Sequence, residues 1–353
     1  MYFDPTPKKN RADMFGFESE YKMLKEALYE KERLIVIKGL RRTGKTSLMN
    51  VVYKELDQPK IFIDMRELTP LTQENFAKHF YLSINEAMNQ VDYLRVILGK
   101  IKSIDVGIKI SIRSEESTIS ILLKMINEEL KKRRKKMVIF VDEAQLAKQI
   151  QADNLFAFIY DYLENIKIVF AGSEVGILDK MLNEEKSALF GRPYLEIEIS
   201  PVSNEKAMQF LTAGFKETGY SVTTDDLEKI IKKTDGVMGW LTLAGYYVSK
   251  YRNLEKGLKK TEEIARSIIL SELDRFFENR KEARARYMLI LKLLAKQSLT
   301  WAELKRGLEA KVGKISNNRF TNYLSTLEDY GFITKKERQY LITDNLLAYA
   351  ISS

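Results

Sequence analysis

The stretch from residue 33 to 50, RLIVIKGLRRTGKTSLMN, constrains the fold more than any other part of the chain. Apolar and mostly β-branched residues at 34–37 predict a buried parallel strand. The next segment, Gly39–Thr46, fits G-x-x-x-x-G-K-[ST] at every position, and helix-forming and apolar residues continue from 47 to 56. Strand, glycine loop and helix in this order predict an α/β fold built around a phosphate-binding loop.

The residue types in this loop suit that chemistry. Two glycines allow the backbone to adopt positive φ, and the loop N–H groups and the helix N-terminus can face phosphates. Lys45 adds a charge for the β- and γ-phosphates, and the Thr46 hydroxyl can ligate Mg²⁺. The predicted nucleotide-binding residues are Gly39, Arg41, Arg42, Thr43, Gly44, Lys45, Thr46 and Ser47.

A second motif, MVIFVDEAQ at 137–145, places two acids after an apolar run. Ligands of open α/β sheets bind at the carboxyl ends of the strands. Asp142 is therefore predicted to hold Mg²⁺ through water, and Glu143 to polarise a water for in-line attack on the γ-phosphorus. An acidic pair alone is a weak signal, but its position about a hundred residues after a phosphate loop makes it strong.

Two further residues carry alternatives that the sequence leaves open. A buried strand at 166–173 ends in Ser173, which either senses the γ-phosphate or the attacking water, or caps the helix predicted at 175–182. Arg192 precedes a strand at 194–199 and is a candidate for neutralising transition-state charge, in this subunit or a neighbour's. The alternative for Arg192 is an ordinary surface arginine.

The pattern changes after residue 200. Amphipathic helices predicted at 203–218, 224–233, 239–251 and 256–279 form a helical unit, expected to lie as a lid beside the nucleotide. Three more helices and a hairpin then outline a winged helix. The predicted domains are a phosphate-loop core at 1–200, a lid at 201–282 and a winged helix at 283–353.

The winged helix is a candidate double-stranded DNA-binding module. Its third helix would expose polar side chains to a major groove, and residues 281–353 hold 13 Lys and Arg against 7 Asp and Glu, a surplus of six. The alternatives are a module used only for internal packing or protein contacts, and ordinary surface charge. The candidate DNA contacts are Asn317, Asn318, Arg319, Asn322 and Ser325 on the helix and Lys335, Lys336 and Arg338 near the hairpin tip.

Composition narrows the class of protein. The chain carries a net charge of +9, no cysteine and one histidine, which excludes disulfides and makes a zinc site nearly impossible. No apolar run approaches membrane-spanning length and the start lacks a signal-like segment, so we expect a cytoplasmic protein with no membrane partner. The alternating stretch at 101–113 predicts an exposed hairpin or a ribbon inserted in the core.

Taken together, these motifs resemble the archaeal ATPase family, P-loop NTPases related to the AAA+ proteins and to the STAND signalling ATPases. The resemblance covers nearly the whole chain. It implies an ASCE-type core, with a strand between the phosphate-loop strand and the acidic strand, a helical lid and a C-terminal winged helix. The segments that carry it are GLRRTGKTSL at 39–48, IFVDEAQ at 139–145, FAGS at 170–173, LFGRPY at 189–194 and the ending from DYGFI to TDNLL at 329–347.

By this resemblance, ATP or ADP and Mg²⁺ are the cofactors, Asp142 supports the metal, Glu143 is catalytic and Ser173 is sensor-like. The sequence departs from the family pattern at two places. Phe17 stands where the family commonly has arginine, which removes one contact, and Met238 replaces the proline of a nucleotide-touching Gly-x-Pro feature. The change at Met238 concerns how tightly closure of the lid is coupled to ADP binding.

The leading functional hypothesis is a slow, Mg²⁺-dependent ATPase in which nucleotide state sets the angle between core, lid and winged helix. An alternative is an initiator-like or regulatory DNA-binding protein with ATP as an allosteric ligand. A third is a STAND-like scaffold that self-associates or recruits a protein partner when ATP is exchanged.

Overall fold

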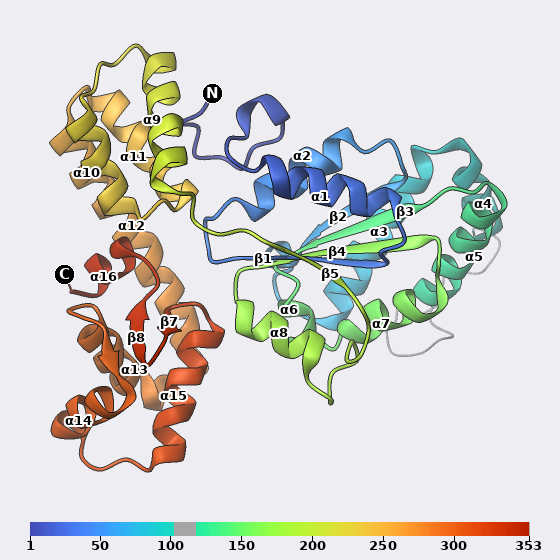
Figure 1. The fold of residues 1–353 in the computed structure, drawn as a ribbon. Coiled ribbons are helices and arrows are strands. Elements are labelled where there is room, and N and C mark those ends of the chain that lie inside the picture. The colour runs from blue at the N-terminus through green and yellow to red at the C-terminus, as the bar shows by residue number, and fades with distance from the viewer. Residues whose placement is uncertain (102–117, 353) are drawn as a thin grey trace.

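The computed structural model describes residues 1–101 and 118–352. The predicted hairpin at 101–113 therefore lies, apart from residue 101, outside the described residues. Figure 1 shows an α/β core followed by a body made mainly of helices. No helix in the described part of the chain is long and apolar enough to span a membrane.

The core contains a parallel sheet of five strands in the order β2-β3-β4-β1-β5. Because β4 lies between the phosphate-loop strand β1 and the acidic strand β3, the predicted ASCE-type order is confirmed. The strands are β1 (Leu34–Lys38), β2 (Lys60–Asp64), β3 (Met137–Asp142), β4 (Ile166–Gly172) and β5 (Leu195–Glu198).

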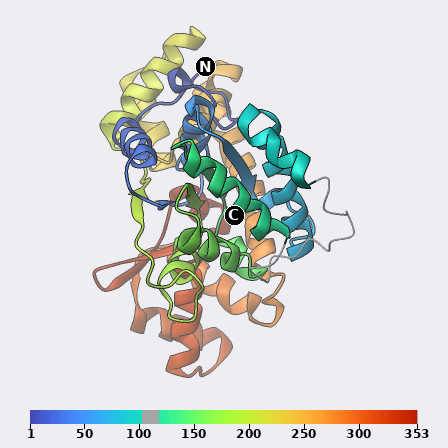
Figure 2. The same ribbon diagram turned by 90° about the vertical axis from the view of Figure 1, so that its right-hand side faces the viewer.

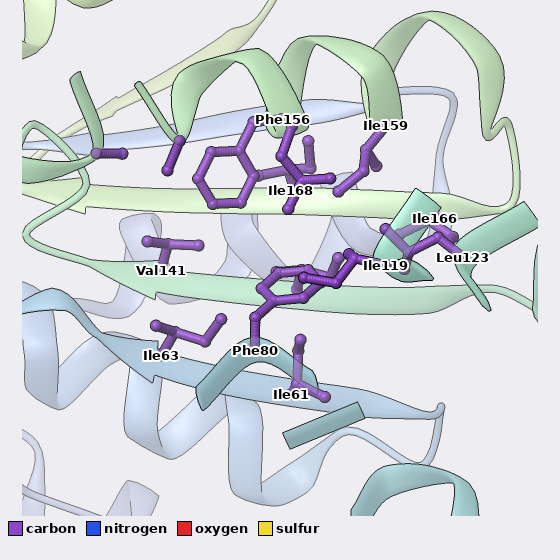
Figure 3. Close-up of a cluster of buried hydrophobic side chains, with 14 of the residues drawn as sticks. Ile61, Ile63, Phe80, Ile119, Leu123, Val141, Phe156, Ile159, Ile166 and Ile168 are labelled. Carbon is purple, nitrogen blue, oxygen red and sulfur yellow. The ribbon is translucent and has the colours of Figure 1, made fainter. Parts of the chain in front are cut away.

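Side chains of the central strands alternate between two apolar layers, as the pleat of a strand requires. On β3, Ile139 and Val141 pack in one layer while Val138 and Phe140 pack in the other. Figure 3 shows part of the first layer, in which Phe80 and Phe156 approach the sheet from helices. Since both faces are covered, the strands are continuous apolar runs, the pattern that predicted them.

Helices α1 and α2 cover one face of the sheet, and the helices from α3 to α8 contribute to the other. The helices of the core are α1 (Glu18–Tyr29), α2 (Lys45–Glu55), α3 (Gln73–Asn89), α4 (Asp92–Ile101), α5 (Thr118–Lys132), α6 (Leu146–Gln149), α7 (Asp153–Tyr162) and α8 (Val175–Asn183).

The remaining elements include the winged helix that the sequence predicts. Its hairpin is extended by a third short strand, β6, and the chain ends in α16; neither was predicted. The elements are α9 (Asn204–Thr218), α10 (Thr224–Thr234), α11 (Met238–Tyr251), α12 (Leu254–Phe277), α13 (Arg284–Leu294), β6 (Leu299–Thr300), α14 (Trp301–Val312), α15 (Asn317–Asp329), β7 (Ile333–Lys336), β8 (Gln339–Ile342) and α16 (Asn345–Ser352).

One apolar cluster joins the last two predicted domains. Trp240 of α11 and Ile269 of α12 belong to the same buried cluster as Leu304, Phe320 and Leu347 of the winged helix. A second cluster joins α11 and α12 to α9 and α10. We call residues 204–352 the C-terminal body, because these shared clusters pack its helices together.

The N-terminal arm connects this body to the core. In both views the arm lies beside α9 (Figures 1 and 2). The Phe3 ring is buried against Phe210 and Phe215, in a socket where two helices carry glycine. A Cβ added at Gly214 or at Gly245 would lie 2.3 Å from the Phe3 ring.

Replacing Gly245 with alanine is therefore expected to destabilise the protein by about 1–3 kcal/mol, the cost of overpacking a filled core site. The measurement is the midpoint of urea denaturation. In a Phe3→Ala background the ring is gone, so the same substitution should become stabilising, because alanine favours a helix over glycine by about 1 kcal/mol. An equal effect of Gly245→Ala in both backgrounds would contradict the socket.

Candidate functional site

A cavity of about 860 Å³ lies at the carboxyl ends of the core strands, facing the C-terminal body. Its walls come from the N-terminal arm, the phosphate loop, the strand ends, and helices α11 and α12. The lining includes charged, polar and apolar side chains from all of these elements: Phe17, Arg41, Arg42, Lys45, Thr46, Arg66, Glu143, Gln145, Ser173, Glu174, Met238, Glu272 and Tyr330.

The phosphate loop has the backbone that the sequence predicts. Gly44 has φ 112°, and a Cβ there would lie 2.8 Å from the Phe17 ring. Gly39 has φ 157°, and a Cβ there would lie 2.2 Å from the carbonyl oxygen of Ile199. Helix α2 starts at Lys45 without a side-chain cap, which leaves N–H groups of its first turn available to an anion.

Lys45 is buried, and its Nζ donates to the carbonyl oxygens of Gly39 (2.8 Å) and Leu40 (2.6 Å). Burial lowers the pKa of Lys45 to about 8, and the nearby Glu143 and Asp142 only partly offset this effect. A bound phosphate would add negative charge next to the ammonium and would compete with the two carbonyl groups for it.

Thr46 and Asp142 meet at the end of β3, where the Thr46 hydroxyl donates to Asp142 Oδ2 at 2.7 Å. Asp142 is fully buried, and burial followed by repulsion from Glu143 raises its pKa. Residues 1–101 and 118–352 contain no group of three or more His, Cys, Asp or Glu arranged around a metal position. A hydroxyl and one carboxylate fit Mg²⁺, which usually completes its shell with water and substrate phosphates.

Glu143 stands next to this pair with φ 51°, and its carboxylate is held from two sides. Oε2 accepts hydrogen bonds from Ser173 Oγ at 2.8 Å and from Gln145 Nε2 at 2.7 Å. Burial opposes ionisation of Glu143, but the Lys45 charge and these hydrogen bonds outweigh it, so its pKa is lowered. The group is therefore a fixed carboxylate, which can accept a proton.

Ser173 makes its side-chain bond to Glu143 and does not cap α8. The N-cap of α8 is Glu174, which makes no side-chain capping bond. The structure thus brings Ser173 into contact with the acidic pair.

Arg66 is a site residue that the sequence analysis missed. Its guanidinium donates three hydrogen bonds to the Asp64 carboxylate, at 2.9, 3.2 and 2.7 Å. Arg66 also reaches Asp142 Oδ2 at 3.2 Å and Glu143 Oε1 at 3.6 Å. Asp64 ends β2, the neighbour of β3, so the strand-end rule that selects Asp142 also points here. Gln145 belongs to the IFVDEAQ motif, but nothing in the sequence pattern indicates that its amide contacts Glu143.

The two loop arginines line the cavity but are held by protein groups. Arg41 donates to Glu174 Oε1 at 2.9 Å and to the backbone carbonyl of Tyr330. Arg42 donates to Glu272 and lies over the Trp240 ring, 4.2 Å from its centroid.

Arg192 lies outside the cavity lining, and its Nε donates to Asp161 at 2.8 Å. The structure therefore does not bring Arg192 together with the other candidates within this chain. The two departures from the family pattern do line the cavity. Phe17 lies against Gly44, and Met238 is the first residue of α11.

The candidate DNA contacts form a separate surface on α15 and the β7–β8 hairpin. All eight residues named above are exposed. Two of them also make contacts within the winged helix: Arg319 Nε donates to the Tyr323 hydroxyl at 2.9 Å, and the Asn317 amide oxygen accepts from Lys305 at 2.8 Å. The far end of α15 packs on α8, where a Cβ at Gly176 would lie 2.5 Å from Asp329.

Comparison with known proteins identifies the family of this chain. Residues 18–244 match the profile of an ATPase domain found predominantly in Archaea. The chain belongs to this archaeal ATPase family. Residues 281–343 of this family member match the C-terminal winged helix-turn-helix domain of MCM proteins.

Two solved structures are similar to this chain. The Walker-type ATPase PABY2304 of Pyrococcus abyssi is 27% identical, with 99% of each chain covered and a TM-score of 0.83. The ORC2 protein of Aeropyrum pernix shares the fold at 14% identity, with 99% of this chain and 95% of that chain covered and a TM-score of 0.60. No curated protein was found to match the chain.

Proposed function

We propose that this protein is an Mg²⁺-dependent ATPase that hydrolyses ATP to ADP and phosphate and acts as a nucleotide-driven conformational switch. The observation that carries the proposal is that Lys45, Thr46 and Glu143 line one cavity, with Glu143 held as a carboxylate, while the buried Asp142 accepts a hydrogen bond from the Thr46 hydroxyl. These residues cover phosphate binding, metal support and proton acceptance, the three tasks of phosphoryl transfer to water.

Each group has a distinct task in this proposal. Lys45 binds and orients the terminal phosphates, while the loop N–H groups bind the phosphate oxygens. Thr46 and Asp142 would hold Mg²⁺, which, when bound, neutralises charge that builds on the phosphate oxygens. Glu143 accepts the proton of the attacking water, and Ser173 and Gln145 keep its carboxylate in one orientation.

The choice of ATP rests on the family and on its neighbours. The Pyrococcus abyssi relative is described as a Walker-type ATPase, and the ORC2 structure of similar fold contains ADPNP and ADP. The switch role and slow turnover are likewise proposed from the family resemblance. The lid would be formed by residues 201–282 and the core by residues 1–200. Arg192, paired with Asp161 in this chain, is proposed to act only across a contact between subunits.

The test is phosphate release by the purified protein with ATP in Mg²⁺ buffer and in EDTA. We expect release that saturates with ATP and stops when EDTA removes the metal. Equal release in both buffers would contradict the metal assignment, and no release above a Lys45→Ala background would contradict ATPase activity.

A second proposal is that the winged helix at 283–353 binds double-stranded DNA. It is supported by the match to an MCM winged helix and by the exposed basic hairpin tip. Scaffold-like assembly with a protein partner or a second copy, and a cytoplasmic location, are further proposals that follow from composition and family resemblance.

Replacing Lys335, Lys336 and Arg338 together with glutamate is expected to abolish measurable duplex binding at low salt, because each phosphate contact contributes through counterion release. Fluorescence anisotropy with a labelled duplex measures it. For the unaltered protein, log affinity should fall with log salt at a slope of about −0.9 per neutralised phosphate. The matched control carries the same change at Lys131 and Lys132, which end α5, and at Lys135 just beyond it. Equal loss in both variants would reject a site at the hairpin.

A further inference from the structure

The phosphate loop makes direct contact with the C-terminal body. Arg41 lies at the centre of this contact, where its guanidinium is bound to Glu174 of the core and to the backbone carbonyl of Tyr330. The same group lies 5.2 Å from the centroid of the Phe332 ring. Since Tyr330 and Phe332 follow α15, one loop arginine joins the nucleotide cavity to the end of the candidate DNA-reading helix.

Arg42 makes the neighbouring contact with the same body. Its carbonyl oxygen accepts from the Gly239 N–H at 2.8 Å, at the start of α11. Its guanidinium is bound to Glu272 of α12 and lies over Trp240. The core therefore meets α11, α12 and the winged helix through two consecutive residues of one loop.

The C-terminal body responds to these contacts as one unit. The winged helix shares one apolar cluster with α11 and α12, so it cannot move far from them without exposing Trp240 and Ile269. The body is connected to the core through residues 199–203 and is touched by the N-terminal arm. A change at Arg41 would therefore alter the angle between the body and the core.

The surroundings of Arg41 make it responsive to phosphate. Arg41, Glu174, Tyr330 and Lys45 all line the same cavity. Arginine binds phosphate through paired charge-assisted hydrogen bonds. A nucleotide polyphosphate carries more charge than the two carboxylates that pair with Arg41, Glu174 at 2.9 Å and Glu272 at 3.8 Å. Lys180 and Asp329 form a second contact between the core and the winged helix. This ion pair is partly exposed, so it contributes less to holding the body on the core.

We propose that Arg41 is a latch. Bound to Glu174 and Tyr330, it holds the C-terminal body on the core; nucleotide phosphates draw it into the cavity and release the turn after α15. This inference rests on the proposed ATP site and adds the residue that connects that site to the winged helix. It gives Arg41 a role in regulation besides the phosphate binding predicted from the sequence.

The test is fluorescence energy transfer between the core and the winged helix of the full chain. The sequence has no cysteine, so Ser19→Cys in α1 and Lys311→Cys in α14, both exposed, supply the only dye sites. Transfer is measured without nucleotide and with Mg²⁺ and a non-hydrolysable ATP analogue, while calorimetry measures binding of the analogue separately.

We expect the analogue to change the transfer in the otherwise unaltered protein. Arg41→Ala should give the changed value without nucleotide, because the latch is missing. Glu174→Gln tests the same contact without altering the loop, and should shift transfer in the same direction. Lys45→Ala keeps the latch, so it should give the original value with and without the analogue.

Unaltered transfer in both Arg41→Ala and Glu174→Gln without nucleotide would overturn the latch. An analogue that binds the unaltered protein but leaves its transfer unchanged would overturn the release by phosphate. Failure of the proposed ATP site would give a different result from failure of the latch. Calorimetry would then detect no binding of the analogue, while Arg41→Ala and Glu174→Gln would still change the transfer without nucleotide.

Discussion

Replacing Glu143 with glutamine is expected to lower the rate of ATP hydrolysis by at least about a hundred-fold, the usual contribution of a general base. Glutamine keeps the shape of the side chain and can still accept a hydrogen bond from Ser173. It cannot accept the proton of the attacking water at neutral pH. The rate is measured as phosphate released under saturating ATP and Mg²⁺.

Binding of ATP should survive this change. Because the substitution removes an interaction needed in the transition state, affinity is expected to stay within about threefold of the unaltered protein. Calorimetry with a non-hydrolysable analogue checks this. Glu164→Gln, an exposed position remote in sequence from the motif, is the matched control and should hydrolyse ATP normally. Hydrolysis by Glu143→Gln at the unaltered rate would show that another group accepts the proton.

Replacing Lys45 with alanine is expected to weaken ATP binding strongly and to abolish hydrolysis. A charge-assisted hydrogen bond contributes about 1.5–3 kcal/mol, which corresponds to a loss of about 10- to 150-fold in affinity. The ammonium is buried and is bound to two loop carbonyls, so no neighbouring lysine can replace it without reorganising the loop. The measurement is the dissociation constant of the ATP analogue.

Lys54→Ala supplies a matched control, because Lys54 lies on the same helix, α2, and is exposed. Its affinity for the analogue should equal that of the unaltered protein. If Lys45→Ala also bound the analogue with unaltered affinity, the phosphate loop would not be the nucleotide site, whatever the sequence pattern suggests.

The sequence predicts the parts of this site that depend on local pattern. The strand, loop and helix around Gly44 and the apolar run before Asp142 leave little freedom in how the backbone folds. The strand-end rule then brings Asp142 to the Thr46 hydroxyl, although 96 residues separate them. The structure therefore brings together the residues that the pattern selects, while their roles stay a prediction.

Contacts that depend on how separate units pack could not be predicted from pattern. Nothing local to Arg41 indicates that its guanidinium would meet Tyr330, since that contact requires the winged helix to lie on the core. The same holds for Phe3, whose socket is made by two glycines on different helices. The helix α16 was missed because its short apolar segment, 345–352, lacks a helical repeat long enough to identify.

The loop arginines illustrate how fold and function are connected here. Sequence analysis assigned Arg41 and Arg42 to the nucleotide because they lie inside the phosphate-loop motif. In the structure their side chains reach outward to Glu272 and Tyr330, in the C-terminal body. One loop thus combines backbone groups and a lysine suited to phosphate with arginines that contact the part of the protein proposed to respond.

The most direct test of this account is a crystal structure with Mg²⁺ and a non-hydrolysable ATP analogue. We predict the terminal phosphates within hydrogen-bonding distance of Lys45, the metal beside Thr46 and Asp142, and Glu143 facing a water on the γ-phosphate. An analogue bound elsewhere, with Lys45 still donating to the carbonyls of Gly39 and Leu40, would contradict the account.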